Sequence, residues 1–326
     1  MLGGVLTQEL SWHWVFWLLF ILSGVHFTGI FIFLPETSRK LVGDGSIRPV
    51  RLMSRSPYFL VSRRWSHPTP KKHAAAEISI PNPFSCLTAL IHKSNFIVSV
   101  VGGLHYTIFG CLAASLSTQM IHIYSLNYLT AGLVYLPSGA GGILASYSMG
   151  RLLDHDYRVT ARRYGLPISK ASNDISKFPI EQARLRSIFP ILVLNAIATS
   201  GYGWSLSAKT HVAAPLVMQF VTGSSSVAIF LVCGSLLTDL NSDRSATVQA
   251  SYNLVRCALG ATGIGLLKTT IDRLGVGWCF TIYAFTGALG IPLFLVLKQK
   301  GKQWRKRREP TDHDERQLEM PEPINE

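Results

Sequence analysis

Seven long apolar blocks, separated by polar loops, constrain this chain more than any other feature. They cover residues 14–34, 95–118, 128–150, 187–207, 212–237, 247–271 and 277–297. Each block is near the length of about 20 residues that an α-helix needs to cross a bilayer. Because lipid offers no partners for backbone N–H and C=O groups, crossing segments must be helical. The sequence therefore predicts an all-α polytopic membrane protein in contact with the lipid bilayer.

The charged residues support this prediction by their scarcity and their positions. Only 15% of the 326 residues are charged, whereas a soluble domain has about 25%. The net charge of +13 would also suit a nucleic-acid-binding protein if the basic residues lined one folded face. They lie instead between and after the apolar blocks, which favours a membrane protein and argues against a nucleic-acid partner.

The distribution of Lys and Arg among the loops predicts the orientation. Loops 35–93 and 151–186 hold ten and eight, and the tail after Leu297 begins with seven; loops 119–127 and 208–211 hold none and one. Cytoplasmic loops are enriched in Lys and Arg. We therefore expect seven crossings with the start of the chain outside, and a cytoplasmic tail that binds anionic lipid. The proline-rich loop 35–93 is expected to be a mostly disordered linker.

Motifs for covalent chemistry are lacking in the sequence. It has no HExxH, GxSxG or phosphate-loop pattern in a suitable context, so we expect that the protein is not an enzyme. The five cysteines are scattered without CxxC spacing, which predicts neither a disulfide framework nor a metal site. No cofactor is expected.

Several short strings carry a resemblance to a known family. They are FLPETSRKLVGDGSIRP (33–49), IPNPF (80–84), GRLLDHDYR (150–158), FPIEQARL (178–185), NLVRC (253–257) and GWCFT (277–281). With them the chain resembles the major facilitator superfamily, specifically its fungal drug:proton antiporters of the quinidine-resistance type. LGG at residues 2–4 is similar to the end of the antiporter motif in the family's fifth span.

The resemblance implies a domain organisation in which the amino-terminal half of a transporter is missing. Residues 1–34 correspond to a remnant of the fifth span and a complete sixth one, and 35–93 to the cytoplasmic linker. Residues 94–297 correspond to the carboxy-terminal six-helix bundle, spans seven to twelve. Residues 298–326 form the tail, first basic and then acidic. In such proteins the substrate lies between two bundles.

The resemblance also implies a function. It predicts export of hydrophobic or cationic small molecules by proton antiport, in the plasma membrane or, alternatively, the vacuolar membrane. A second reading is a truncated half that does not transport, or a half-transporter that associates with another half. A more remote alternative, a seven-span receptor, fits the number of crossings but not the 59-residue first cytoplasmic loop.

Three groups of residues are candidates for function. In the family, the loop after the eighth span braces the cytoplasmic gate with a charge network, which assigns this role to Arg151, Asp154 and Arg158; the alternative is a solvated helix end. The small residues Gly142, Ser146 and Gly150, four positions apart, predict a close helix-packing seam, which also slides if the bundle moves during transport.

The third group consists of candidate substrate-cavity residues. Arg256 lies inside an apolar block, where a guanidinium needs a partner or a wet cavity unless it extends to the interface. Tyr106, Tyr135, Gln219 and Asn253 lie in spans that line the family's cavity, but each is also able to bond a neighbouring helix. No Asp or Glu lies in the middle of a block, so we expect the proton carrier in the missing half and no proton-coupled efflux by this chain alone.

The predicted orientation is testable with cysteines placed in two loops. Single cysteines at Ser125 and Ser172, in a background without the native ones, are treated in intact cells with a membrane-impermeant thiol reagent. We expect labelling at position 125 and none at 172, because the basic loop faces the cytoplasm. Permeabilised cells, in which both positions should react, are the control. Labelling at 172 but not at 125 in intact cells would show that the orientation is reversed.

Overall fold

The computed structural model describes residues 3, 5–6, 11–34, 85–165 and 178–319, and in these ranges every regular element is a helix. The predicted all-α fold is thus confirmed. The chain divides into two units, one of residues 2–82 and one that begins at Pro83 and runs to the end. Most of the expected linker, residues 35–84, lies outside the described residues. Its last part does not, because helix α5 (Ser85–Ile91) falls within it.

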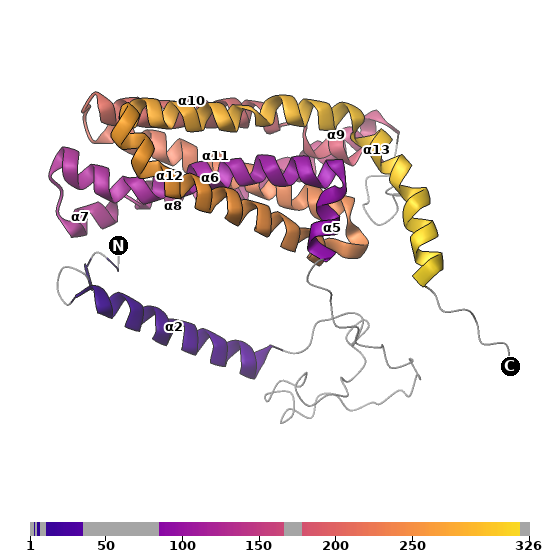
Figure 1. Cartoon of the computed structure of the whole chain (residues 1–326), viewed down its shortest axis with the longest axis horizontal. Coiled ribbons are helices and arrows are strands. Elements are labelled where there is room, and N and C mark those ends of the chain that lie inside the picture. Colours follow the sequence, from indigo (N-terminus) through magenta and orange to yellow (C-terminus); the bar gives the residue numbers. More distant parts are fainter. Residues whose placement is uncertain (1–2, 4, 7–10, 35–84, 166–177, 320–326) are drawn as a thin grey trace. The chain divides into compact units, whose positions relative to one another are not determined.

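Helix α2 (Trp12–Phe33) is the regular element of the first unit (Figure 1). Its 22 residues rise about 33 Å, enough to cross a hydrocarbon core of about 30 Å. It contains no Asp, Glu, Lys or Arg, and none of its residues is buried within the unit. A helix that is apolar on all sides and covered on none is typical of a segment surrounded by lipid.

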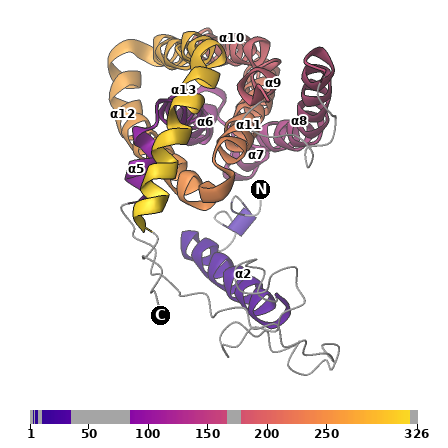
Figure 2. The same ribbon diagram turned by 90° about the vertical axis from the view of Figure 1, so that its right-hand side faces the viewer.

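The second unit is a bundle of long helices. These are α6 (Lys93–Tyr124), α8 (Leu136–Arg163), α10 (Ile188–Ser207), α11 (Ala213–Leu240), α12 (Ser245–Ala288) and α13 (Gly290–Glu319). Helix α11 packs against α6, α8 and α10, and α12 packs against α6 and α10. Figure 2 shows this arrangement, with the short helices α7 (Tyr128–Leu133) and α9 (Ile180–Arg184) beside the bundle.

Five stretches of the described chain are long and apolar enough to cross a membrane: 12–33, 93–124, 128–163, 213–240 and 245–305. The last has 61 residues, about 90 Å of helix, and therefore contains two of the predicted blocks. Helix α10 occupies the remaining predicted block, 187–207. It has 20 residues, and its contacts with α11 and α12 place it in the bundle.

A single glycine divides the longest stretch. Gly275 has φ 81° and ψ 164°, whereas its neighbours in α12 are helical. This left-handed backbone is accessible to glycine, because it has no Cβ to clash with its own carbonyl. The chain turns at this point and runs back along the bundle, as Figure 1 shows in orange and yellow. The two predicted blocks 247–271 and 277–297 are therefore antiparallel without an intervening loop.

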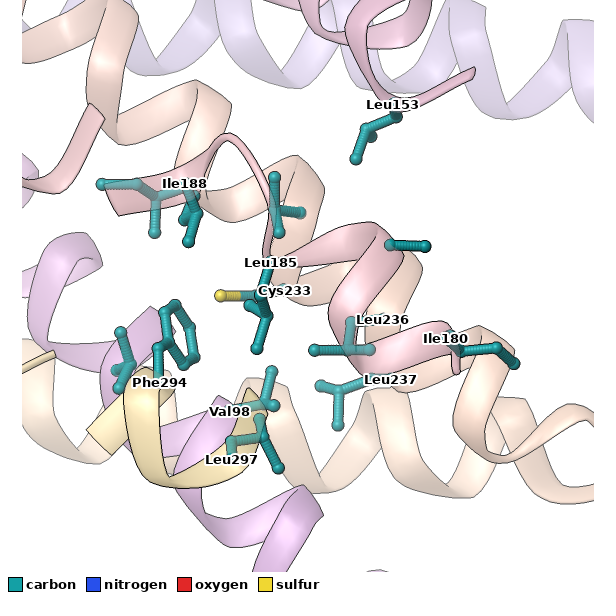
Figure 3. Close-up of a cluster of buried hydrophobic side chains, with 14 of the residues drawn as sticks. Val98, Leu153, Ile180, Leu185, Ile188, Cys233, Leu236, Leu237, Phe294 and Leu297 are labelled. Carbon is teal, nitrogen blue, oxygen red and sulfur yellow. The ribbon is translucent and has the colours of Figure 1, made fainter. Parts of the chain in front are cut away.

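The interior of the bundle combines an apolar cluster with buried polar groups. The cluster contains side chains from all six long helices and from α5 and α9. Figure 3 labels ten of its residues: Val98, Leu153, Ile180, Leu185, Ile188, Cys233, Leu236, Leu237, Phe294 and Leu297. Elsewhere, buried Asn195 of α10 donates to the hydroxyl oxygens of Ser225 and Ser226 of α11, at 2.8 and 3.0 Å. These hydrogen bonds link two helices, and lipid offers no donors or acceptors that would replace them.

The outer surface of the unit is strongly apolar. Large side chains such as Ile143, Ile197 and Phe285 are 76%, 63% and 70% exposed. A water-soluble protein rarely leaves so many large apolar side chains uncovered. Apolar residues outside and hydrogen-bonded polar residues inside are what a bundle surrounded by lipid requires.

The seam between α8 and α11 is displaced by one residue from the predicted one. Gly141, Ala145 and Met149 are buried, whereas Ser146 and Gly150 are exposed. Gly142 lies at the margin: a Cβ atom there would be 3.4 Å from Val227. The predicted stripe therefore lies beside the face that meets α11, because a spacing of four does not fix the rotation of the helix; whether that stripe packs against another partner stays a prediction.

We expect Gly141→Ala to destabilise the bundle. A Cβ atom at this position would lie 2.7 Å from the carbonyl oxygen of Phe220 and closer still to the hydroxyl of Ser224. Relieving such a clash requires the two helices to separate, at a cost of about 1–3 kcal/mol. Gly150→Ala is the matched control, because nothing lies within 4 Å of a Cβ there. Unfolding in detergent should show a lower free energy of unfolding for Gly141→Ala and no change for Gly150→Ala. Equal losses in the two variants would contradict the assigned seam.

Candidate functional site

Arg256 of α12 is partly exposed and lies among three aromatic rings of the second unit. Its guanidinium carbon is 4.6 Å from the ring centre of Tyr106, 5.1 Å from that of Phe230 and 5.8 Å from that of Tyr252. These rings come from α6, α11 and α12, so the site forms where the three helices meet. Aromatic faces attract a cation at these distances, and more strongly where water is excluded.

Glycines in α6 and α12 hold two of the rings close to the arginine. Tyr106 lies across Gly260, where a Cβ would be 3.1 Å from the ring, one helical turn after Arg256. Tyr252 lies against Gly102, where a Cβ would meet the ring at 2.6 Å. Helices α6 and α12 would not fit together this closely if these two positions carried side chains. The aromatic pocket is therefore built by the same close approach that packs α6 against α12.

The positive charge of Arg256 has no counter-charge in the described bundle. No ion pair includes this residue among the described ones. Its Nε atom is buried and has no hydrogen-bond partner. Arg256 lies eleven residues after the start of α12, about 17 Å along the axis, and its contacts are with the rings inside the bundle. Arg256 therefore lies well away from the start of α12, with its Nε buried and the residue as a whole partly exposed.

The other candidate cavity residues do not gather at this pocket, with one exception. Tyr106 contacts Arg256, and Asn253 is exposed three residues before it on α12. Tyr135 instead donates its hydroxyl to the carbonyl of Ala113 at 2.9 Å, joining the start of α8 to α6. Gln219 of α11 is buried, and its Oε1 atom has no partner.

The residues predicted for the gate do not form a charge network with one another in this structure. Arg151, Asp154 and Arg158 are exposed, and Arg151 lies 4.3 Å from the ring centre of Tyr147. The buried acid of this segment is Asp156, 3.8 Å from Nε of Arg186. These three residues are exposed, as in the alternative of a solvated helix end, and their role in a gate stays a prediction.

A charge cluster that the sequence analysis missed lies at the same end of the bundle. Arg184 of α9, with only 4% of its side chain exposed, contacts Asp239 at the end of α11 at 2.6 Å. Its Nε donates to the same carboxylate at 2.7 Å. Buried Glu181 lies 3.8 Å from Arg305 of α13. Helix α9 is therefore fastened to α11 and α13 through charged side chains.

Arg305 belongs to this cluster and not to the exposed part of the tail. It donates to the carbonyl of Phe178 at 2.7 Å, and neighbouring Gly301 packs against Glu181. The binding of anionic lipid by the tail stays a prediction, to which Arg305 is expected to contribute less than the other basic residues, because it lies in this charge cluster. The charged residues Glu181 and Arg184 are visible in the sequence FPIEQARL. Their partners lie 124 and 55 residues further along the chain, and a local sequence pattern does not identify contacts at such separations.

A reciprocal pair of amides lies near this cluster. Asn95 at the start of α6 and Asn241 after α11 each donate to the other's side-chain oxygen, at 3.3 and 2.9 Å. Asn95 also donates to the carbonyl of Ala89 in α5 at 3.1 Å. Charged and amide groups thus join α5, α6, α9, α11 and α13 at the end of the bundle to which the basic segments connect.

Comparisons with known proteins agree on one family. A sequence model of the Major Facilitator Superfamily matches residues 1–264. MFS-type transporter phiD of a fungal strain (Fungal sp.) is 36% identical over 310 residues, 94% of this chain and 47% of that protein. MFS-type transporter R5 of Phoma sp. is 33% identical over 304 residues, which are 93% of this chain and 58% of that protein.

A third relative has a named substrate. Citrate exporter 1 of Aspergillus niger is 32% identical over 317 residues, which make up 94% of this chain and 60% of that protein. The chain thus spans about half the length of the curated relatives it matches.

The contact between Arg184 and Asp239 should contribute to the stability of the bundle. Asp239→Asn removes the negative charge beside a buried guanidinium, and we expect a loss of about 1–3 kcal/mol in the free energy of unfolding. A double variant that carries both Arg184→Met and Asp239→Leu should lose less free energy of unfolding than the sum of the losses in the two single variants.

Asp154→Asn is the control for this prediction, because it removes the same charge from an exposed position and should change stability by less than about 0.5 kcal/mol. The measurement is unfolding in detergent, followed by circular dichroism. Equal losses in Asp154→Asn and Asp239→Asn would contradict a specific role for the buried pair.

Proposed function

The chain belongs to the Major Facilitator Superfamily, and we propose that it acts as the carboxy-terminal part of a transporter that exports small molecules by proton antiport. The finer type, a fungal multidrug exporter similar to the quinidine-resistance transporters, is part of this proposal. So is its location in the plasma membrane, with the vacuolar membrane as the alternative. The family assignment leaves no support for a seven-span receptor.

The observation that carries the proposal is the charged residue kept inside the bundle. An ionisable side chain among apolar spans is costly, and in membrane proteins it usually marks a substrate or ion pathway. Arg256 fits this description, because three rings surround it and no acid neutralises it. A purely structural arginine would be expected to have a carboxylate or carbonyl partner, as Arg184 and Arg305 have.

The exposed faces of α8 and α12 are suited to packing against a second helical bundle, which is part of the proposal. Small or polar residues make up much of both: Gly139, Ala140, Ser146 and Gly150 on α8, and Asn253, Cys257, Ala258, Ala261, Thr262 and Gly265 on α12. Helix α2, by contrast, exposes mainly large apolar side chains. Small residues favour helix contact over lipid contact, so these faces suit association with another half. They favour the half-transporter reading over a chain that acts alone.

The positions of the acids favour a proton carrier on that other half. Asp156, Glu181 and Asp239 lie at the end of the bundle with the basic segments, and Glu181 and Asp239 are engaged by arginines. A proton carrier must be reachable from both sides of the membrane, which a group at one end is not. Export in this proposal needs no covalent chemistry and no enzyme activity.

The substrates expected from the resemblance are hydrophobic or cationic molecules. The rings of Tyr106 and Phe230, which are 38% and 41% exposed, offer apolar surface for such a molecule. One relative is named a citrate exporter, so an anionic substrate occurs among proteins similar to this chain.

Fusion to an amino-terminal half tests the proposal. We expect that this chain, joined behind the amino-terminal half of MFS-type transporter phiD, lowers the accumulation of fluorescent dyes in cells, and that a protonophore abolishes the effect. The chain alone should have no such activity, because one bundle has no second wall against which a cavity can alternate. Protonophore-sensitive efflux by the chain alone would contradict the need for a second half, and a well-expressed fusion without transport of any tested compound would contradict the function.

A further inference from the structure

We infer that the aromatic pocket around Arg256 binds the carboxylate of an anionic organic substrate. The inference rests on the proposed transport function and specifies the substrate class of the same site. It departs from the hydrophobic or cationic class that the resemblance implies. Three properties of the pocket carry it: the geometry of the rings, the unpartnered Nε of the guanidinium and the lack of an ion pair to Arg256 among the described residues.

The rings leave the donor edge of the guanidinium without an acceptor. Tyr106, Phe230 and Tyr252 present aromatic ring centres to the guanidinium carbon at 4.6–5.8 Å. An aromatic ring compensates part of the cation's charge but accepts its N–H groups poorly. A guanidinium has five such donors, and the buried Nε of Arg256 has no acceptor. Because Arg256 as a whole is partly exposed, an incoming group with two acceptor oxygens is able to reach donors of the guanidinium beyond the buried Nε.

A carboxylate fits this need better than a neutral or cationic group. It accepts two parallel N–H bonds from the planar guanidinium, and such charge-assisted pairs are stronger than neutral hydrogen bonds. A cation at the same place would meet an uncompensated positive charge in a medium of low dielectric constant, where the repulsion is large. The pocket therefore selects by charge, and its rings select for an apolar body attached to the carboxylate.

The neighbouring residues support a ligand with an apolar part. Val255 and Leu259 flank Arg256 on α12, and both pack with it against Gly103 of α6. Tyr106 is partly exposed, so the pocket is not closed on the side of its ring. A carboxylate could also come from an acid on the other half of the transporter, and the experiment separates this source from a substrate.

The test uses the full 326-residue chain in lipid nanodiscs, because all described parts of the pocket belong to this chain. Thermal unfolding is measured with 2-naphthoate, with its neutral counterpart 2-naphthamide and with the cation 2-naphthylmethylammonium, and separately with citrate and trimethyl citrate. A ligand that binds the folded state raises the unfolding temperature. We expect 2-naphthoate, citrate or both to raise it, and their neutral or cationic counterparts to have a smaller effect.

Variants tie any such shift to the pocket. Arg256→Gln should weaken carboxylate binding by about tenfold or more, because the charge-assisted bonds are lost. Arg256→Lys should bind with intermediate strength, since it keeps the charge without the planar fork. Arg273→Gln removes the same charge from an exposed position of α12 and should leave binding unchanged. If Arg256→Gln fails to fold, Tyr106→Leu, which removes one ring, should still weaken binding.

The outcomes distinguish this inference from the proposed function. Shifts that are equal for the acid, amide and ammonium, no shift with either carboxylate, or carboxylate binding that persists in Arg256→Gln would overturn the inference. The last two results would also fit an arginine that pairs with an acid of the other half. Transport of cations by the fusion described above would then still support the exporter function, while the substrate class assigned to Arg256 would be wrong.

Discussion

Lipid tails are as apolar as leucine side chains, so apolar contacts between helices in a membrane contribute little free energy to their association. The rest of this structure depends on that constraint. The bundle is held instead by close approach of backbones and by hydrogen bonds that lipid cannot replace. Gly141 brings α8 against α11, and Gly102 brings α6 against α12. Asn195 joins α10 to α11 through two serine hydroxyls. Specificity between helices therefore comes from a few small and polar positions, while the large apolar residues mainly determine that the helices lie in the membrane.

The same constraint separates the charges into two kinds. Glu181, Arg184, Asp239 and Arg305 lie at one end of the bundle, where each has a charge of opposite sign within 4 Å, so we assign them the role of fastening helices. Arg256 is partly exposed, and its guanidinium lies among three rings without an ion pair to any described residue. An unpaired charge in such a place stays costly until something binds it. The contrast between the two kinds of arginine, and not the mere presence of a charge, singles out the pocket.

The sequence predicted the helices better than their rotations and contacts. Apolar blocks of spanning length identify a crossing helix whatever its neighbours, and the break at Gly275 falls between two predicted blocks. The seam of α8 was placed one residue away, because a spacing of four describes a stripe without saying which stripe meets α11. Arg256 was recognised from its cost in lipid. Its aromatic partners, like the pairing of Arg184 with Asp239, depend on helices that are distant in the sequence, and no local pattern encodes such a contact.

The turn at Gly275 has a consequence for biosynthesis. Two antiparallel spans without a loop between them form a helical hairpin, which is able to enter the bilayer as one body. An arginine at the centre of a helix opposes insertion by about 2.5–3.5 kcal/mol, whereas Leu, Ile, Phe and Val each favour it by about 0.3–0.6 kcal/mol. The first arm of the hairpin carries Arg256, and the second arm, with Phe280, Phe285, Phe294 and Leu297, contains no charged residue between Val276 and Leu297. If the two arms insert together, the favourable insertion free energy of the second arm offsets part of the cost of inserting Arg256 with the first arm.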